Sequence, residues 1–384
     1  MSDNKKQNKP NVPNLRFPEF SGEWCLRRLE ECAVFLDDQR KPIKSSDRIN
    51  KMGLYPYYGA SGEIDRVDDF IFDDNLVLLS EDGANIIDRN YRVAFIINGK
   101  TWVNNHAHVL KPKQDIDLDF LSESLERLDY APYNTGTTMP KLNQEICRNI
   151  KISVPSYKEQ KKIGYLLSLL NNRIAIQSKV IKDLKSLYDV ICQKLYSPND
   201  KLGWQEFKYS DLFTISNERN SRLQYTNVLS ASQEYGMVER GELNIDIKYD
   251  ATSIKNYKIV HPNEYVIHLR SFQGGFAYSD KTGICSPAYT ILVPNGKLIP
   301  AFLKYYFTST QFINSLRIVT YGIRDGRSIS VEELLQLKIS IPTISEQHYI
   351  LSVMQLWEEK IRIEECHLSN LQKQKQYLLR QMFI

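Results

Sequence analysis

Two histidines in His106-Ala107-His108 come closest, by their spacing, to a metal site in this chain. On a β-strand both rings would face one side, as metal ligands do. No cluster of cysteines or carboxylates with ligand spacing accompanies them, and the six cysteines include no Cys-x-x-Cys pair. The sequence therefore favours no bound metal, and its cysteine usage fits a reducing compartment.

Catalytic motifs are present only in incomplete form. Asn98-Gly99-Lys100-Thr101 ends like a phosphate-binding P-loop, but Ala94 stands where the first glycine is required. Ser286-Pro287-Ala288-Tyr289 is similar to the Pro-Pro-aromatic loop with which amino-methyltransferases hold their target amine, but its second proline is Ala288. No Gly-rich strand–turn–helix suited to S-adenosylmethionine occurs. Glu358-Glu359-Lys360 falls in a long predicted helix, where a solvated face is the ordinary role. We therefore expect no catalytic residue, and neither a nuclease nor a translocase.

Polar loops with cations remain, and the chemistry they suit is nucleic-acid recognition. The candidates in the first half are Tyr58, Gly59, Ala60, Ser61, Asn105, His106, Thr135, Thr137, Thr138 and Lys141. Those in the second half are Ser232, Gln233, Arg270, Ser271, Gln273, Arg324 and Arg327. Arginines can read guanine or clamp phosphate, and glutamine can read adenine. The Gly-rich and Thr-rich stretches suit close approach of backbone to phosphate. Ordinary polar surface loops stay open as the alternative.

The charge distribution supports nucleic-acid binding only locally. Net charge is +4, but Ser156 to Tyr196 holds eight Lys or Arg against three acids, a net of +5. Residues 63–88 hold nine acids and one Arg. If the chain binds DNA, we expect this acidic stretch to point elsewhere, because phosphates repel it.

The chain is an internal repeat, which must position these loops. The matching stretches are Lys151-Ile152-Ser153-Val154-Pro155 with Lys338-Ile339-Ser340-Ile341-Pro342, Glu159-Gln160 with Glu346-Gln347, and Gly22-Glu23-Trp24 with Leu202-Gly203-Trp204. The first two pairs share an offset of 187 in residue number, and the third has an offset of 180. Each half contains short apolar runs typical of strands, at 75–79 and 93–97 and at 264–267 and 289–293.

A long segment almost free of Gly and Pro follows each globular stretch. Apolar residues recur there with steps of four and three, which is a heptad seam. The seam residues are Ile163, Leu167, Leu170 and Ile174 in the first segment, and Ile350, Met354, Trp357 and Ile361 at the same offset of 187 in the second. The seam continues to Leu195 and Met382. It predicts two helices of roughly 40 residues, each about 60 Å long. A helical hairpin within one core would show the same heptads, but the duplicated layout favours a spacer between two heads.

The predicted fold class is α+β, with two similar globular domains separated by two long antiparallel helices that form a coiled-coil-like rod. The two halves are related as a pseudo-twofold internal repeat. The predicted boundaries are a polar arm at 1–20, domains at 21–155 and 199–342, and spacer helices at 156–198 and 343–384. No run of about eighteen apolar residues occurs, so we expect no membrane span. We expect a cytoplasmic protein.

This layout resembles the specificity subunits of type I restriction–modification systems over nearly the whole chain. Local stretches that carry the resemblance are Arg16-Phe17-Pro18-Glu19-Phe20, Tyr58-Gly59-Ala60-Ser61-Gly62, Met139-Pro140-Lys141-Leu142-Asn143 and the Lys-Ile-Ser-x-Pro…Glu-Gln opening of each helix. The Glu-Gln-x-x-Ile pattern is met at Ile163, and the second copy keeps its apolar position at Ile350.

The resemblance implies that each domain is a target-recognition domain that reads one half of a split DNA site. It also implies that the helices set the spacing and dock two modification subunits, which methylate adenine. The implied partners are double-stranded DNA and those two subunits, with restriction subunits as an optional addition. The chain itself would need no cofactor, with S-adenosylmethionine on the modification subunit. Two alternatives stay open: a two-headed protein-binding scaffold, which the acidic stretch favours, and a DNA methyltransferase.

Overall fold

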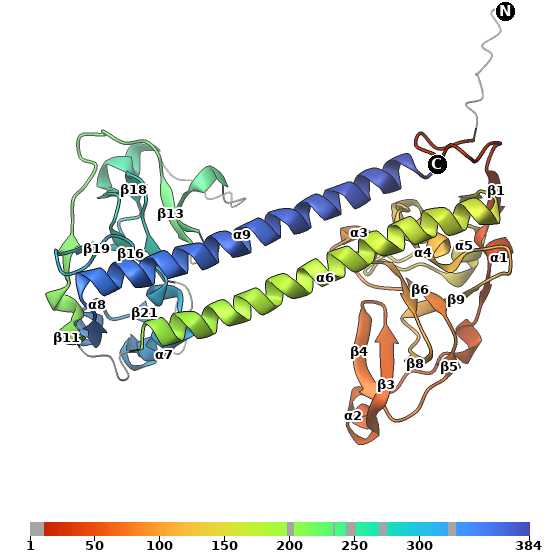
Figure 1. Cartoon of the computed structure of the whole chain (residues 1–384), viewed down its shortest axis with the longest axis horizontal. Coiled ribbons are helices and arrows are strands. Elements are labelled where there is room, and N and C mark those ends of the chain that lie inside the picture. Colours follow the sequence, from red (N-terminus) through yellow and green to blue (C-terminus); the bar gives the residue numbers. More distant parts are fainter. Residues whose placement is uncertain (1–10, 198–202, 233–234, 243–250, 269–274, 322–327) are drawn as a thin grey trace, which may run out of the picture. The chain divides into compact units, whose positions relative to one another are not determined.

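The computed structural model describes residues 11–197, 203–232, 235–242, 251–268, 275–321 and 328–384. Its contacts divide the chain into two compact units. The first unit is Met1–Ser178 with Cys366–Ile384, and the second is Lys179–Glu365. Each unit contains one globular domain and a share of both long helices, α6 (Tyr157–Leu195) and α9 (Ile344–Gln381) (Figure 1).

Antiparallel strands dominate the domain of the first unit, which we call the first domain. One sheet has the order β2-β9-β6-β7, with bounds Ala33–Phe35, Ala107–Pro112, Leu76–Ser80 and Ala94–Ile97. A second sheet has the order β4-β3-β8-β5, with bounds Gly62–Val67, Met52–Gly59, Lys100–Val103 and Phe72–Asp73. In this sheet β3 and β8 run parallel. Strand β1 (Cys25–Arg28) pairs with β10 (Lys151–Val154). The helices are α1 (Leu29–Cys32), α2 (Ser45–Arg48), α3 (Asn85–Asp88), α4 (Leu118–Glu126) and α5 (Gln144–Asn149).

Strand β6 is the centre of the first domain's core. It lies between β9 and β7, and its four apolar residues are fully buried. Val77 and Leu79 pack in one cluster with residues of α4, while Leu76 and Leu78 pack in another with Val103 of β8. A strand covered on both faces reads as a continuous apolar run, which is why the sequence predicted it.

The second unit holds the second domain, whose main sheet has the order β12-β19-β16-β17. Its strands are Phe213–Ser216, Thr290–Pro294, Tyr265–Ile267 and Phe276–Tyr278. The paired strands beside it are β11 (Gln205–Lys208) with β22 (Lys338–Ile341), β13 (Leu229–Ser232) with β14 (Gly236–Glu239), β15 (Lys258–Val260) with β18 (Gly283–Cys285), and β20 (Thr320–Tyr321) with β21 (Ser328–Ile329). Helices α7 (Thr310–Ser315) and α8 (Val331–Gln336) follow the main sheet in sequence. Aromatic rings fill the core, with Phe307 in contact with Tyr265, Phe276 and Phe312.

The repeat in the sequence is a repeat of elements. Strand β11 corresponds to β1 at an offset of 180 at both ends, while α8 and β22 correspond to α5 and β10 at an offset of 187. The main sheets match strand for strand, β2-β9-β6-β7 with β12-β19-β16-β17. The difference between the two offsets therefore arises inside the globular domains, between the first strand and the last helix of each.

A buried glutamine near the start of α6 explains one repeated pair of residues. The Gln160 side chain accepts a hydrogen bond from the Asp117 backbone N–H at 3.0 Å. It donates to the carbonyl oxygens of Asp115 at 3.1 Å and Pro155 at 3.0 Å. The amide thus uses its donor and acceptor sides to fasten the helix to the segment before α4.

The same connection recurs at the start of α9, at the offset of 187. Gln347 accepts from the Ile299 N–H at 2.9 Å and donates to the carbonyls of Lys297 at 2.8 Å and Pro342 at 3.1 Å. Both glutamines are 1% exposed. The glutamine of the repeated Glu-Gln pair therefore has a structural role, which is to attach each helix to its own domain.

Within each unit the start of one long helix packs against the end of the other. In the first unit Ile163 and Leu167 are buried in one cluster with Met382. In the second unit Ile350 and Met354 are buried with Cys192 and Tyr196. The pairing in each unit is therefore antiparallel. The buried seam residues are Ile163, Leu167, Leu170, Ile350 and Met354, and the half-buried ones are Ile174, Trp357 and Ile361. No helix in the described parts of the chain is both long and apolar enough to cross a membrane.

Candidate nucleic-acid interface

Loops at one end of the first domain's sheets converge, and they carry the predicted first-half residues. Two contacts hold the end of β3 and the turn that follows it. The Asn104 N–H, directly after β8, donates to the Tyr58 carbonyl of β3 at 3.0 Å. The Ser80 hydroxyl, at the end of β6, donates to the Ala60 carbonyl of the turn at 2.7 Å. These contacts bring residues 58–61 and 104–106 together.

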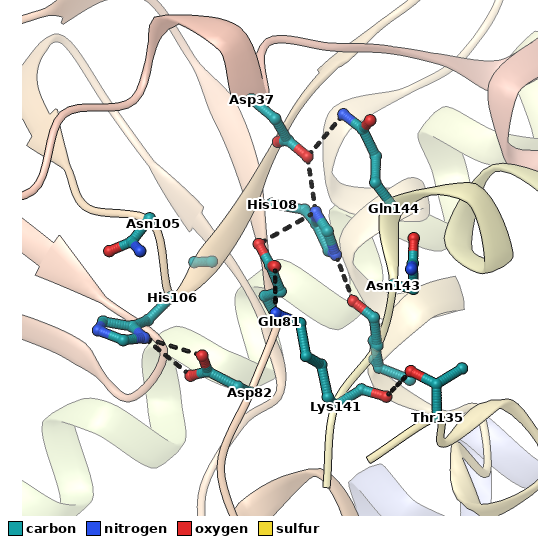
Figure 2. Close-up of polar contacts among 12 residues, drawn as sticks. Asp37, Glu81, Asp82, Asn105, His106, His108, Thr135, Lys141, Asn143 and Gln144 are labelled. Carbon is teal, nitrogen blue, oxygen red and sulfur yellow. Dashed lines mark hydrogen bonds and ion pairs between the residues drawn. The ribbon is translucent and has the colours of Figure 1, made fainter.

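Two further backbone bonds add the loop that precedes α5. The Glu81 N–H donates to the His106 carbonyl at 2.9 Å, and the Leu142 N–H donates to the Glu81 carbonyl at 2.7 Å. Asp82 and Lys141 form an isolated antiparallel bridge. The structure thus places the predicted residues Asn105, His106, Thr135 and Lys141 around one segment, residues 80–82, as Figure 2 shows for the polar contacts.

A buried histidine forms the floor of this loop cluster. His108 Nδ1 lies 2.7 Å from an Asp37 carboxylate oxygen, and Nε2 lies 2.9 Å from the Leu142 carbonyl (Figure 2). Both partners only accept hydrogen bonds, so both ring nitrogens must carry protons. Burial lowers the pKa of His108, but the hydrogen bond and charge of Asp37, together with Cys147, raise it more, to about 10. His108 is therefore an imidazolium that holds the loop before α5 on the end of the sheet.

Carboxylates in the cluster are neutralised by neighbouring cations. Glu81 lies 2.7 Å from Arg40 and 3.3 Å from the Lys141 ammonium. Asp37 lies 3.6 Å from Arg40 as well as beside His108. Glu81 and its neighbour Asp82 belong to the acidic stretch 63–88, and the structure places them among the predicted contact residues. Pairing with Arg40 and Lys141 would lessen the repulsion between Glu81 and phosphates.

The predicted residues differ in exposure. Ser61, Asn105, His106, Thr135, Thr137, Thr138 and Lys141 are exposed, Tyr58 and Ala60 are half-buried, and Gly59 is buried. Gly59 is closely packed, because a Cβ there would lie 2.3 Å from Ile64 Cδ1 and 3.1 Å from Asn104 Nδ2. Tyr58 likewise packs inward, with its ring 6.2 Å from that of Phe95.

Sequence reasoning missed the groups beneath the loops: Asp37, Arg40, Glu81, Asp82 and the role of His108. Their partners lie far along the chain, with 41 residues separating Arg40 from Glu81 and 71 separating Asp37 from His108. The feature of the sequence that could have pointed to these groups was the pair of histidines, His106 and His108. His106 lies in the turn before β9 rather than on a strand, so the two rings do not share a face; each Nδ1 is bound to a different aspartate.

Most predicted contact residues of the second domain lie outside the described residues. These are Gln233, Arg270, Ser271, Gln273, Arg324 and Arg327. Ser232 is described and ends β13, where its hydroxyl accepts a hydrogen bond from the Tyr235 N–H at 3.2 Å. Among the described residues, the geometry of such a loop cluster can therefore be given for the first domain.

The incomplete catalytic motifs have structural roles. Gly99 lies at φ +67° in the turn between β7 and β8 and exchanges backbone hydrogen bonds with Asp74, so a strand follows it where a P-loop would continue as a helix. In Ser286-Pro287-Ala288-Tyr289 the Tyr289 N–H donates to the Ser286 carbonyl, a turn that leads directly into β19. Glu358 is not simply solvated, because it accepts a hydrogen bond from the Tyr305 hydroxyl at 2.6 Å.

Comparison with known families decides the relationship. The family model of the type I restriction modification DNA specificity domain matches residues 21–186 and, a second time, residues 201–373. The chain belongs to this family. Its two specificity domains coincide with the two halves of the internal repeat. The predicted resemblance is confirmed, as is the α+β architecture of two similar domains and two long helices.

Relatives along the full length agree with this assignment. A Haemophilus influenzae protein described as a type I restriction enzyme specificity subunit is 26% identical, over 92% of this chain and 93% of its own length. The specificity subunit of the Methanocaldococcus jannaschii enzyme MjaVIII is 23% identical, over 98% and 95%. Among solved structures, the S subunit of a type I restriction-modification system from M. genitalium superposes with a TM-score of 0.62 at 15% identity, covering 97% of this chain and 99% of that one. That likeness concerns the fold.

Proposed function

We propose that this specificity chain is the sequence-specific DNA-binding subunit of a type I restriction–modification complex, and that each domain binds one half of a split DNA site. The observation that carries the proposal is the duplication of the specificity domain on a duplicated helix. The two domains keep the same main sheet but differ in their loops, as two readers of different half-sites would. Two heads joined in one chain also bind more tightly than either alone, through effective concentration.

The face of the helices turned away from the domains suits the docking of two modification subunits. Leu169 and Ile176 lie two helical turns apart on α6 and are 43% and 63% exposed. The same two residue types recur on α9 at the offset of 187, where Leu356 and Ile363 are 70% and 51% exposed. We call these two pairs the duplicated apolar stripe. An exposed apolar surface that is repeated with the same residues fits two copies of one partner.

The domains attach to another face of the same helices. Asn171 of α6, two residues and about 200° from Leu169, donates to Glu123 of the first domain at 2.8 Å. Its counterpart at the offset of 187, Glu358 of α9, accepts from Tyr305 of the second domain. The duplicated apolar stripe is therefore free to bind a partner while each domain stays attached.

The chain itself would not be catalytic, since its near-miss motifs form turns. The modification subunits would carry S-adenosylmethionine and methylate adenine, restriction subunits would be an optional addition, and the complex would act on double-stranded DNA in the cytoplasm.

Salt dependence tests DNA binding directly. A complex of this chain with its modification subunits should bind DNA containing its site and lose affinity steeply between about 50 and 200 mM salt. Exchanging residues 24–150 for those of a relative should change one half of the methylated site only. A complex that retains no DNA at low salt would overturn the proposal and favour a protein-binding scaffold. A change in both halves would overturn the assignment of one domain to each half.

Stoichiometry tests the duplicated apolar stripe. Leu169→Asp and Leu356→Asp should each reduce the modification subunits bound per chain from two to one, and the double variant should bind none, as counted by native mass spectrometry. Each substitution replaces apolar burial worth about 1.5 to 3 kcal/mol with a buried charge. Ser186→Asp, at an exposed polar position of α6, is the matched control and should bind two. Two subunits on both single variants would contradict the assignment.

A further inference from the structure

The exposed histidine of the loop cluster has a fixed orientation. His106 Nδ1 lies 3.0 and 2.9 Å from the two carboxylate oxygens of Asp82, and the His106 side chain is 51% exposed. A carboxylate only accepts hydrogen bonds, so Nδ1 carries a proton whatever the charge of the ring. The other ring nitrogen, Nε2, points away from Asp82 in Figure 2. His106 therefore presents Nε2 to whatever binds the loops.

The turn that carries His106 is held in place before any ligand arrives. Asn104 is 5% exposed, its backbone N–H donates to the Tyr58 carbonyl, and its side-chain oxygen accepts from the His106 N–H at 2.8 Å. The His106 carbonyl in turn accepts from the Glu81 N–H. A polar group fixed on a rigid turn loses little freedom on binding, which is the requirement for discriminating between ligands.

We infer that His106 reads a base of the first half-site through Nε2, with Asp82 as the positioning residue; this inference rests on the proposed function. With Nδ1 protonated, the neutral ring offers Nε2 as an acceptor. In the major groove only the exocyclic amines of adenine and cytosine donate a hydrogen bond. The base that faces His106 is therefore adenine or cytosine.

The surrounding charges balance without a charge on His106. The three carboxylates of Asp37, Glu81 and Asp82 are matched in number by the cations Arg40, His108 and Lys141.

The test uses the complete complex with its modification subunits, which methylates a randomised DNA library at pH 8 that is then sequenced. His106→Phe should reduce the preference at one adenine or cytosine position of the first half-site by about tenfold, a single good base contact. Asp82→Asn should weaken the preference at the same position, and His106→Gln should retain part of it, because an amide oxygen still accepts. The second half-site should stay unchanged throughout.

A matched control comes from the second domain, where His261 Nε2 lies 3.0 Å from Glu218 in another exposed pair. His261→Phe should leave the first half-site as it was. Identical sites for wild type and His106→Phe, or guanine or thymine at the affected position, would overturn the inference and leave the proposed function intact. A wild-type complex that selects no split site would overturn the proposed function itself.

Discussion

Glu123 of α4 joins the first domain to both long helices, and its replacement gives a quantitative test of how the first unit is held together. Its side chain is 3% exposed and lies 2.6 Å from Arg92 of the same domain. The Asn171 amide of α6 donates to it at 2.8 Å, and the Lys375 ammonium of α9 lies 3.1 Å away. Burial raises the pKa of Glu123, but Arg92 and then Lys375 lower it further, so the group is ionised.

Glu123→Gln keeps the shape and removes the charge. Arg92 and Lys375 would both lose the carboxylate that they pair with here. Breaking a buried ion pair by removing one partner lowers the free energy of unfolding by about 3 to 5 kcal/mol. The Arg92 side chain is 32% exposed and that of Lys375 only 14%, so the lower end, about 3 kcal/mol, is expected. Burial and the like charge of Arg92 already lower the pKa of Lys375, which limits the loss because that ammonium can give up its proton.

Urea unfolding, read by hydrogen exchange of the first domain, measures the effect. Lys375→Met should lower the free energy of unfolding by less, about 1 kcal/mol, because Glu123 keeps its contacts with Arg92 and Asn171. The double variant should be more stable than Glu123→Gln alone, because it leaves no unpaired ammonium at position 375. The contribution of Glu123 is present above its unfolded pKa and is lost as pH falls, because its folded pKa is depressed. A Glu123→Gln variant within about 1 kcal/mol of wild type at pH 7 would refute the reasoning.

Two further substitutions probe the other buried polar groups. His108→Phe should destabilise the first domain by about 3 kcal/mol at pH 6. The difference in stability should shrink as pH rises towards 10, because the folded state raises the pKa of His108. Such a group stabilises the fold fully below its pKa in the unfolded chain and loses that contribution as pH rises through its pKa in the folded protein. Urea unfolding of both proteins at pH 6 and pH 10 checks it, and a constant difference would contradict the imidazolium. Gln347→Leu should cost about 2 to 4 kcal/mol, because it strands the buried Ile299 N–H and two carbonyls; unchanged exchange of the Ile299 amide would contradict it.

The elements that the sequence predicted are those whose signal is local. The helices α6 and α9 follow from heptads, and Leu76–Ser80 and Ala94–Ile97 follow from apolar runs between turns. The charge balance of the loop cluster was not predictable, because Arg40 meets Glu81 only after the sheets have formed. The same holds for the orientation of His106, which depends on Asp82, 24 residues away.

The two halves differ in chemistry at the place where each domain meets its helices. At the offset of 187, Asn171 corresponds to Glu358, and the position of Lys375 to that of Tyr188. The first unit joins domain and helix through a buried carboxylate in the domain, whereas the second uses Glu358 on the helix, bound by Tyr305 and Lys304 of the domain.

The carboxylate that accepts these hydrogen bonds thus belongs to the domain in the first unit and to the helix in the second. A domain seated on the other half's helix positions would bring the Glu123 carboxylate against the Glu358 carboxylate, and like charges in contact are unfavourable. The duplicated helices therefore repeat the same apolar stripe at the offset of 187, while the residues that join each helix to its domain differ between the halves. This difference disfavours an exchange of the two specificity domains between the helix positions.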